Sequence, residues 1–246
     1  MRPARSAGLT FVSLHQARFY KQTIVGARWG DIAMDATLKH KSSMIVVGPT
    51  MSGKTTFVEN LIRHRSVMYD RAPQRILWFT GSQYEQAEEA EEKYIIYEGL
   101  PESFDMVEPF DLVVLDDLMN EMQNSKVVSN LFTRMVHHTP CTVISLSQNL
   151  FQSSKEARTR ALNTQYMVLF KNPRDATQIG VLARQMYPGE SKFITDAYKH
   201  ATGRRAHGYL FIDLHQETPE ELRVQSQILP NEAPNIVYIP PGYKHK

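Results

Sequence analysis

The chain has 246 residues and a mass of 28.2 kDa, enough to bury a substantial core, and this length favours one large domain with appendages over two small domains. Hydrophobic residues make up 42% and charged residues 22%, as in ordinary globular proteins, and no apolar run reaches the ~18 residues of a membrane-spanning helix. The net charge of +2 does not by itself indicate a nucleic-acid partner, and the single Cys141 excludes an internal disulfide, which favours an intracellular setting.

The N-terminal segment is basic. It has no acidic residue before Asp31, and its positive charges come from Arg2, Arg5, Arg18, Lys21 and Arg28. A basic arm accounts for this pattern better than a transit peptide, and polar residues interrupt "GLTFVSLHQ" too soon for a secretion signal. We therefore expect a basic N-terminal arm over residues 1–40.

Short apolar and β-branched runs, each bounded by polar or turn residues, predict buried strands at 43–47, 75–80, 111–116, 142–147, 166–170 and 208–213. Apolar residues at helical spacing predict helices over 54–65 and 125–138, and the acidic stretch over 85–94 predicts a solvated helix. Near-continuous apolar strands separated by helices are typical of a mostly parallel sheet covered on both faces. The sequence therefore predicts an α/β fold with a mostly parallel central sheet flanked by helices.

The most specific local motif follows the first predicted strand. It fits G-x-x-x-x-G-K-[ST] at every position, and with the next residue it comprises Gly48, Pro49, Thr50, Met51, Ser52, Gly53, Lys54, Thr55 and Thr56. A strand enters this loop and an amphipathic helix leaves it, as a phosphate-binding loop requires, so its N–H groups and the helix N-terminus face an anion. We expect ATP here, with Lys54 at the β and γ phosphates and Thr55 binding Mg²⁺.

Two further groups follow later predicted strands. Asp116 and Asp117 end the run "DLVVLD", where adjacent carboxylates are costly unless a cation or a reaction uses them. We expect Asp116 to bind Mg²⁺ through a water and Asp117 to orient or deprotonate the attacking water; the alternative is that the pair caps the next helix. Gln148 ends the strand "TVISLS" and is predicted to sense the γ-phosphate, with a simple strand-end turn as the alternative.

Taken in this order, the three motifs resemble the FtsK/HerA superfamily of P-loop ATPases, in which a Gln stands at the tip of the strand that follows the Walker B strand. The stretches "GPTMSGKTTFVENLI", "EGLPE", "DLVVLDDLM", "LFTRMVHH", "SQNLF", "NTQYMVLFKNPRDATQI" and "GYLFIDL" look like the DNA-packaging ATPases of Polinton/Maverick elements and related double-stranded DNA viruses. The poxvirus packaging ATPase is a more distant relative. The family most often has Glu as its catalytic carboxylate, whereas this chain has Asp117.

This resemblance implies a homo-oligomeric ring that threads double-stranded DNA and couples ATP hydrolysis to genome packaging, with a capsid or portal partner and no membrane. Its place of action would be the host nucleus or a cytoplasmic virus-assembly site. An arginine from the neighbouring subunit would complete each site, and the candidates are Arg174, Arg158 or Arg160. Non-specific DNA contacts would go to phosphates, and the candidate residues are Lys155, Arg158, Arg160, Arg204 and Arg205.

We accordingly predict three parts: the basic arm 1–40, a P-loop ATPase domain of the RecA and FtsK/HerA kind over 41–218, and a polar, proline-bearing tail over 219–246 that drapes over a neighbour or stays mobile. The leading hypothesis is an ATP-driven DNA translocase that packages a genome. The alternatives are a P-loop kinase acting on a small molecule and a nucleotide-gated DNA-binding or scaffold protein with weak turnover. A kinase would need neither the acidic pair nor the polar strand tip.

Overall fold

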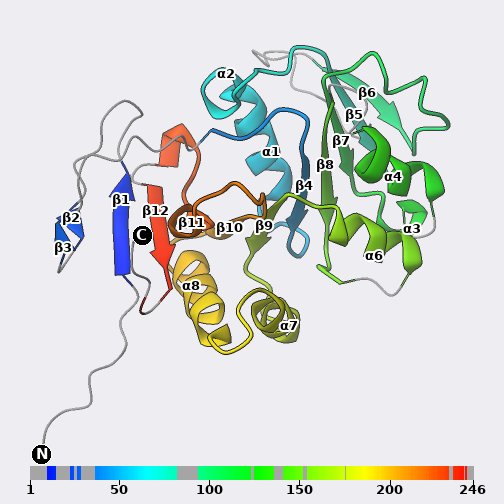
Figure 1. Ribbon diagram of the computed structural model, residues 1–246. Helices are drawn as coiled ribbons and strands as arrows, with labels where there is room; N and C mark the ends of the chain where they lie inside the picture. The colour runs from blue at the N-terminus through cyan, green and yellow to red at the C-terminus, as the bar shows by residue number, and fades with distance from the viewer. Residues whose placement is uncertain are drawn as a thin grey trace, which may run out of the picture. The chain divides into compact units, whose positions relative to one another are not determined.

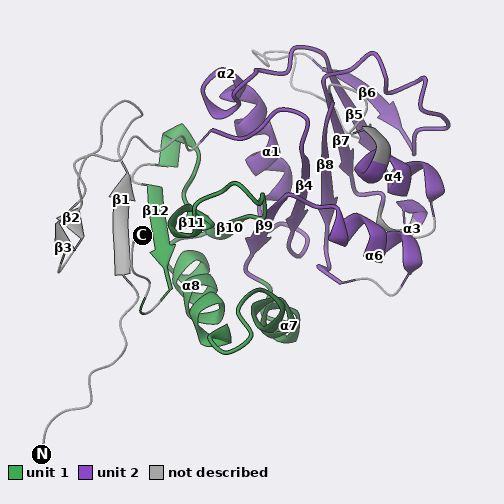
Figure 2. Ribbon diagram, viewed as in Figure 1, with its two compact units in different colours: residues 1–35, 172–246 green, residues 36–171 purple. Residues whose placement is uncertain are grey.

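The computed structural model of the chain (Figure 1) describes residues 10–14, 23–24, 27–28, 37–81, 94–122, 125–135, 141–151, 154–174, 176–232, 235–240 and 242. By the contacts among its residues the chain divides into two compact units (Figure 2). Unit 2 is continuous and comprises residues 36–171, whereas unit 1 combines both ends of the chain, residues 1–35 and 172–246.

Unit 2 is built on parallel strands in the order β9-β4-β8-β7-β5-β6, and every neighbouring pair among them is parallel. Their bounds are β4 Ser43–Val47, β5 Ile76–Thr80, β6 Ile95–Glu98, β7 Leu112–Asp116, β8 Thr142–Ser147 and β9 Tyr166–Phe170. Five of these strands confirm the sequence prediction. The sixth, β6, was not predicted, because it is short and mostly exposed and so lacks a buried apolar run.

The strands of unit 2 form its core because they are covered on both faces. Every residue of β4, β5, β7, β8 and β9 is buried. β7 and β8 lie in the middle of the strand order, so Leu112, Val113, Val114 and Leu115 have no exposed surface. This is the near-continuous apolar composition that a doubly covered parallel sheet requires.

Helices flank this sheet (Figure 1). Their bounds are α1 Lys54–Arg63, α2 Arg65–Met68, α3 Met119–Met122, α4 Lys126–Asn130 and α6 Lys155–Leu162, with a π-helical turn at Leu131–Met135. α1 buries Phe57, Val58, Leu61 and Ile62, as their spacing predicts. The acidic segment predicted as a solvated helix over 85–94 falls outside the described residues, except for Tyr94.

Unit 1 contains antiparallel strands in the order β1-β12-β11-β10. Their bounds are β1 Thr10–Leu14, β10 Tyr209–Asp213, β11 Val224–Ser226 and β12 Asn235–Ile239; β2 Thr23–Ile24 and β3 Ala27–Arg28 form a separate antiparallel pair. Its helices are α7 Ala176–Met186 and α8 Ser191–Gly203, with 3₁₀ turns at Glu220–Leu222 and Pro230–Glu232. β10 confirms the sixth predicted strand.

The segment after residue 218, predicted as a polar tail, contributes β11 and β12 to this antiparallel sheet. This segment joins the sheet because residues of β12 such as Val237 and Tyr238 bury apolar side chains. The surrounding polar and proline residues made this short apolar run easy to miss in the sequence. The division predicted at residues 40 and 218 stays a prediction. Within the described part of the chain, no helix is long and apolar enough to cross a membrane.

The central position of β7 yields a stability prediction. We expect Leu115→Ala, at a side chain with 0% exposure, to lower the free energy of unfolding by about 2–5 kcal/mol, because it leaves a cavity in a doubly covered sheet. Leu162→Ala makes the same chemical change at a side chain that is 75% exposed and should stay within about 0.5 kcal/mol of the parent protein. Urea unfolding measures both, and equal losses would contradict the placement of β7.

Candidate nucleotide-binding site

The loop between β4 and α1 has the geometry of a phosphate-binding loop. Gly53 adopts a φ of 102°, which favours glycine, as it leads into α1. A Cβ atom added to Gly48 would lie 2.6 Å from Ser52 Oγ and 2.7 Å from Phe170 Cβ, so only glycine fits there. Met51, between them, also has a positive φ of 63° and is 89% exposed. The loop therefore follows the tight course that its sequence pattern predicts.

Lys54 begins α1, where its amine interacts with the loop. Its Nζ donates hydrogen bonds to the carbonyl oxygens of Gly48 at 2.9 Å and Pro49 at 3.0 Å. Burial lowers the pKa of Lys54, while the charges of Asp116 and Asp117 act in the opposite direction. The Lys54 amine is thus held against the loop. Because it lies beside the N-terminus of α1, it adds to the positive end of the helix dipole, and together they favour an anion at this position.

Thr55 and Asp116 meet although they are far apart in the sequence. Thr55 Oγ1, in the first turn of α1, donates a hydrogen bond to Asp116 Oδ2, at the end of β7, at 3.0 Å. Asp116 is only 9% exposed, and this burial raises the pKa of its carboxyl despite the Thr55 hydrogen bond and the Lys54 charge. A hydroxyl beside a buried carboxylate is an oxygen donor set suited to Mg²⁺, which usually takes few protein ligands and completes its shell with water and phosphate.

Asp117 differs from its neighbour in both backbone and exposure. Its φ of 53° places it in the left-handed region, which Asp tolerates better than most residues, and its side chain is exposed. The change of backbone direction after Asp116 therefore separates the two carboxylates. One is buried at Thr55 and the other is accessible to solvent.

Gly81 is a site residue that the sequence analysis missed. Its N–H donates to the carbonyl oxygen of Asp116 at 3.0 Å, and a Cβ atom added to it would lie 2.1 Å from the carbonyl oxygen of Asp117. The available signal was a glycine directly after β5, the strand that pairs with β7 and ends at the same edge. Gly81 lets these two strand ends approach closely.

Gln148 follows β8 and is exposed. The preceding residue, Ser147, accepts the Gly48 N–H at its carbonyl oxygen, at 3.0 Å, and its hydroxyl donates to the carbonyl oxygen of Asn149 at 2.8 Å. The β8 strand end is therefore hydrogen-bonded directly to the phosphate-binding loop. This supports the predicted location of Gln148, while its role as a γ-phosphate sensor stays a prediction.

The predicted arginines occupy different environments. Arg158 is exposed on α6, and Arg174 is exposed in unit 1, where its backbone N–H donates to Asn172 Oδ1 at 3.1 Å. Arg160 is only 5% exposed and donates from its guanidinium to the carbonyl oxygen of Met122 at 2.7 Å. The candidacy of Arg160 as an arginine reaching a neighbouring subunit, or as a DNA contact, is therefore wrong, because its charged group is committed inside unit 2.

The described residues contain no cluster of three or more His, Cys, Asp or Glu side chains able to hold a metal ion. A cation at this site would instead depend on Thr55, Asp116 and the nucleotide itself. Together, the parallel sheet, the loop between β4 and α1, and Asp116 at the end of β7 give unit 2 the α/β architecture of a P-loop NTPase, as the sequence predicts.

Comparisons with known proteins find similarity among solved structures. No protein-family model matches the chain, and no curated protein matches it. The chain is similar to the DNA-packaging ATPase B204 from Sulfolobus turreted icosahedral virus, with a TM-score of 0.48 and 7% identity over 74% of this chain and 96% of that one.

Two further structures are similar. For the genome-packaging NTPase B204 from Sulfolobus turreted icosahedral virus 2 in complex with sulfate, the TM-score is 0.47, with 10% identity over 86% of this chain and 100% of that one. For the Legionella pneumophila ATPase DotB it is 0.37, with 11% identity over 66% and 52%. TM-scores below 0.5 at these identities do not assign an activity.

The buried carboxylate makes stability depend on pH. Because burial in the folded state raises the pKa of Asp116 above its ordinary 3.8, ionisation of this carboxyl costs stability, and the cost grows as pH rises above 3.8. We expect Asp116→Asn, without nucleotide or Mg²⁺, to raise the thermal unfolding temperature at pH 7, with a gain that shrinks as pH falls toward 3.8.

Asp111→Asn is the matched control of opposite sign. Burial alone would raise the pKa of Asp111, but hydrogen bonds from Arg75 and Gln74 and the Arg75 charge lower it overall. Removing that carboxylate should therefore lower the unfolding temperature at pH 7. If both variants shifted in the same direction, the electrostatic account of Asp116 would fail.

Proposed function

We propose that unit 2 binds ATP with Mg²⁺ and hydrolyses it. The observation that carries this proposal is the 3.0 Å hydrogen bond between Thr55 and Asp116, which joins the end of the phosphate-binding loop to the end of β7. A loop match alone can arise by chance, whereas an Mg²⁺ donor pair formed by residues so distant in the sequence requires the whole sheet to be in place.

The roles of the residues follow from their positions. Residues Gly48 to Thr56 surround the phosphates, the N–H groups in the first turn of α1 donate to them, and the Lys54 amine exchanges its two carbonyl partners for β and γ phosphate oxygens. Thr55 and Asp116 hold Mg²⁺, which neutralises charge on the phosphates when it is bound. Asp117 accepts the proton of the attacking water, a role suited to its accessible carboxylate. Gln148 orients that water without adding negative charge.

We further propose that hydrolysis drives translocation of double-stranded DNA for genome packaging, in a homo-oligomeric ring of the FtsK/HerA and Polinton/Maverick kind. The sequence motifs support this assignment. Arg158 and Arg174, both exposed, remain the candidates for completing a neighbouring subunit's site. A capsid or portal partner, and action inside a host cell at a virus-assembly site or in the nucleus, belong to the same proposal.

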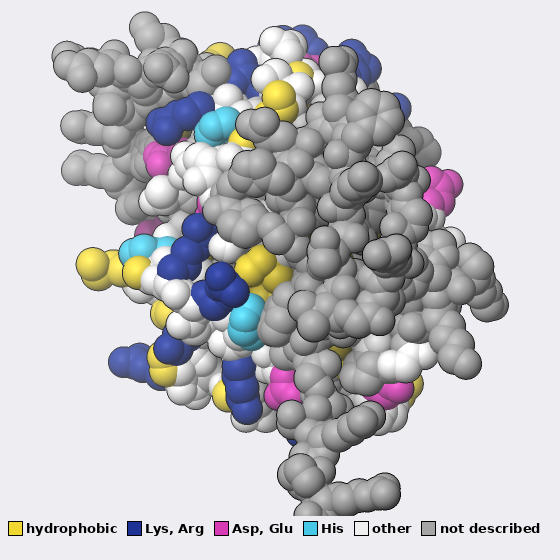
Figure 3. Space-filling view, turned by 90° about the vertical axis from the view of Figure 1, so that its left-hand side faces the viewer, with side chains coloured by type: hydrophobic (Ala, Val, Ile, Leu, Met, Phe, Trp, Pro, Cys, Tyr) yellow, Lys and Arg dark blue, Asp and Glu magenta, His cyan; other side chains and the backbone are white. Residues whose placement is uncertain are grey.

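Basic surface on the protein supports a polyanionic partner. Figure 3 shows several Lys, Arg and His side chains among other residues on the described part of the face that it draws. In unit 1, the segment from Ala197 to Ile212 has no acidic residue and carries Lys199, Arg204 and Arg205. Arg205 pairs with Glu232, whereas Lys199 and Arg204 are exposed and form no ion pair with a carboxylate within the described residues. Lys199 and Arg204 are therefore the charges in this segment most available to phosphates.

ATP hydrolysis tests the first proposal. Lys54→Ala should abolish nucleotide binding or turnover, because it removes the cation that the phosphates need. Asp117→Asn should still bind MgATP yet hydrolyse it about 10²-fold more slowly, because the proton acceptor is lost. Steady-state phosphate release and binding of a fluorescent ATP analogue measure the two effects. Normal turnover by Asp117→Asn would contradict the base assignment, and phosphate transfer to a small molecule would favour a kinase.

DNA affinity tests the second proposal. Binding to long duplex DNA should stimulate hydrolysis and weaken steeply as salt rises. We expect Lys199→Ala/Arg204→Ala to lower the slope of log affinity against log salt by roughly 2, since each phosphate contact contributes about 0.9. Arg71→Ala/Lys126→Ala removes the same charge from exposed positions in unit 2 and should leave the slope unchanged. Equal effects of the two double variants would argue against a DNA surface at Lys199 and Arg204.

A further inference from the structure

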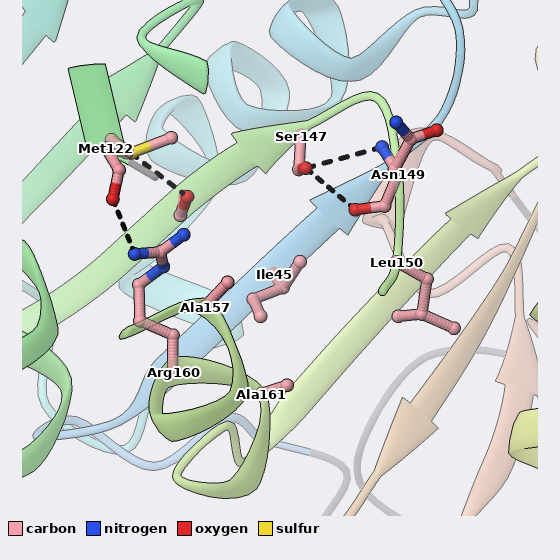
Figure 4. Close-up of a pocket in the computed structure, with 9 residues that line it drawn as sticks. Ile45, Met122, Ser147, Asn149, Leu150, Ala157, Arg160 and Ala161 are labelled. Atoms are coloured by element: carbon pink, nitrogen blue, oxygen red, sulfur yellow. Dashed lines mark hydrogen bonds between the residues drawn. The ribbon is translucent and has the colours of Figure 1, made fainter. Parts of the chain in front are cut away.

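Arg160 is a buried cation that the proposed hydrolysis does not use. It lies in α6 and is 5% exposed, and burial lowers the pKa of its guanidinium, with the charge of Glu156 acting in the opposite direction. Burying an arginine is costly unless its group is hydrogen-bonded to a partner. Figure 4 shows its side chain extending toward Met122, whose carbonyl oxygen accepts a hydrogen bond from Arg160 at 2.7 Å.

Hydrogen bonds hold Met122 in place. Its N–H donates to the carbonyl oxygen of Leu118 at 2.8 Å, and its sulfur accepts the Ser145 hydroxyl of β8 at 3.7 Å. Its carbonyl oxygen accepts both the Arg160 guanidinium at 2.7 Å and, at the longer distance of 3.3 Å, the Ser125 N–H. Met122 ends α3, the short helix that begins two residues after Asp117. Arg160 therefore makes the shorter of the two hydrogen bonds that hold the far end of the segment from Asp117 to Met122.

Asp117 needs such support because its backbone is in the left-handed region, with a φ of 53°. A non-glycine residue in this conformation costs about 1–3 kcal/mol and persists only when the surrounding structure imposes it. On one side Gly81 packs against the Asp117 carbonyl oxygen, and Leu118 is fully buried. On the other side, α3 ends at the Arg160 hydrogen bond. The strained turn is thus held from both ends.

The same arginine lines a cavity that it shares with residues of the β8 strand end. A cavity of about 20 Å³, enough for about one water, is lined by Ser147, Asn149, Leu150, Ala157 and Arg160, among others (Figure 4). Ser147 is the residue whose carbonyl oxygen accepts the Gly48 N–H of the phosphate-binding loop. Arg160 therefore contacts the segment that follows Asp117 and shares a cavity with the strand end that precedes Gln148.

We propose that Arg160 is a positioning residue for the hydrolysis step: by holding the carbonyl oxygen of Met122 it keeps α3 in place and so maintains the turn that presents Asp117 to the attacking water. This inference rests on the proposed ATP hydrolysis. Arg160 itself does not contact the nucleotide. Loss of this support displaces the carboxylate, and a misplacement of about 1 Å in a catalytic group can cost about 10²-fold in rate.

Steady-state kinetics of Arg160 variants test the inference. Arg160→Met should lower kcat by about 10- to 100-fold with little change in KM or MgATP binding, because the phosphate-binding loop remains intact. Arg160→Lys keeps one donor for the Met122 carbonyl oxygen and should recover most of the rate. Leu162→Ala, on the same helix but 75% exposed, should leave kcat unchanged. Parent-like kcat in Arg160→Met would overturn the proposal.

A double-mutant cycle separates positioning from general support of the fold. If Arg160 acts through Asp117, then Arg160→Met should cause no further loss in kcat in the Asp117→Asn background. A full additional 10-fold loss there would show that Arg160 acts by another route. Circular dichroism and MgATP binding check folding, and if Arg160→Met fails to fold, the cycle is run with Arg160→Gln.

Hydrogen exchange gives a readout that does not require turnover. Arg160→Met should speed amide exchange in residues 117–122 and leave β4 unchanged, whereas unchanged exchange in 117–122 would contradict the proposal. If the parent protein does not hydrolyse ATP but Arg160→Met still speeds this exchange, the proposed function would be refuted. The inference that Arg160 anchors α3 would then still stand. The two failures are therefore distinguishable.

Discussion

The hydrogen bond between Thr55 and Asp116 joins the two parts of unit 2 on which a nucleotide site depends. It connects α1, the helix after the phosphate-binding loop, to the end of β7. In the sheet, β7 is separated by β8 from β4, the strand that leads into that loop. The carboxylate that accepts it is nearly buried, and the nearby Lys54 amine compensates only part of that cost. A site with an under-compensated negative charge favours a divalent cation, so under the proposed function the geometry that destabilises the empty protein would also favour binding of a metal-bound nucleotide.

Several backbone positions near this hydrogen bond are strained or tightly packed, although positive φ angles also occur elsewhere, at Lys41, His207 and Gln227. Met51 and Asp117, both non-glycine residues, have positive φ angles, and Gly48 and Gly81 sit where a Cβ atom would collide with neighbouring atoms. Each of these features allows two pieces of backbone to approach more closely than ordinary side chains permit. The buried strands of unit 2 provide the rigid frame that tolerates them. Left-handed backbone also offers a physical reason for Asp at position 117, because short polar side chains adopt this conformation most readily.

Much of this architecture could be predicted from the sequence, because its signals are local. The strands at 43–47 and 142–147 and the loop from Gly48 to Thr55 each depend on residues adjacent in the chain. Features that arise from neighbouring strands could not be predicted in this way. The contact between Gly81 and Asp117 exists only because β5 pairs with β7, and the exposed edge strand β6 has no apolar run to reveal it.

Arg158 and Arg160 show one feature that local sequence predicts and one that depends on tertiary contacts. Two positions in a helix differ by about 200° around its axis, so one of these arginines had to face inward if the other faced solvent. The sequence places Ala157 on the same side as Arg160, and both are buried. Burial of Arg160 could nevertheless not be predicted from the sequence. Its hydrogen-bond partner is a backbone carbonyl group, and every residue has one, so no particular side chain indicates it.

The pairing of β1 with β12 has a consequence for biosynthesis. Thr10 pairs with Ile239, so β1 acquires this hydrogen-bonding partner only after more than two hundred further residues have been made. Unit 2, which is continuous, contains all the strands of its parallel sheet by residue 171 and can fold while translation proceeds. The nascent chain therefore carries β1 without this partner until β12 emerges, and an edge of this kind is open to mispairing with other chains during that time.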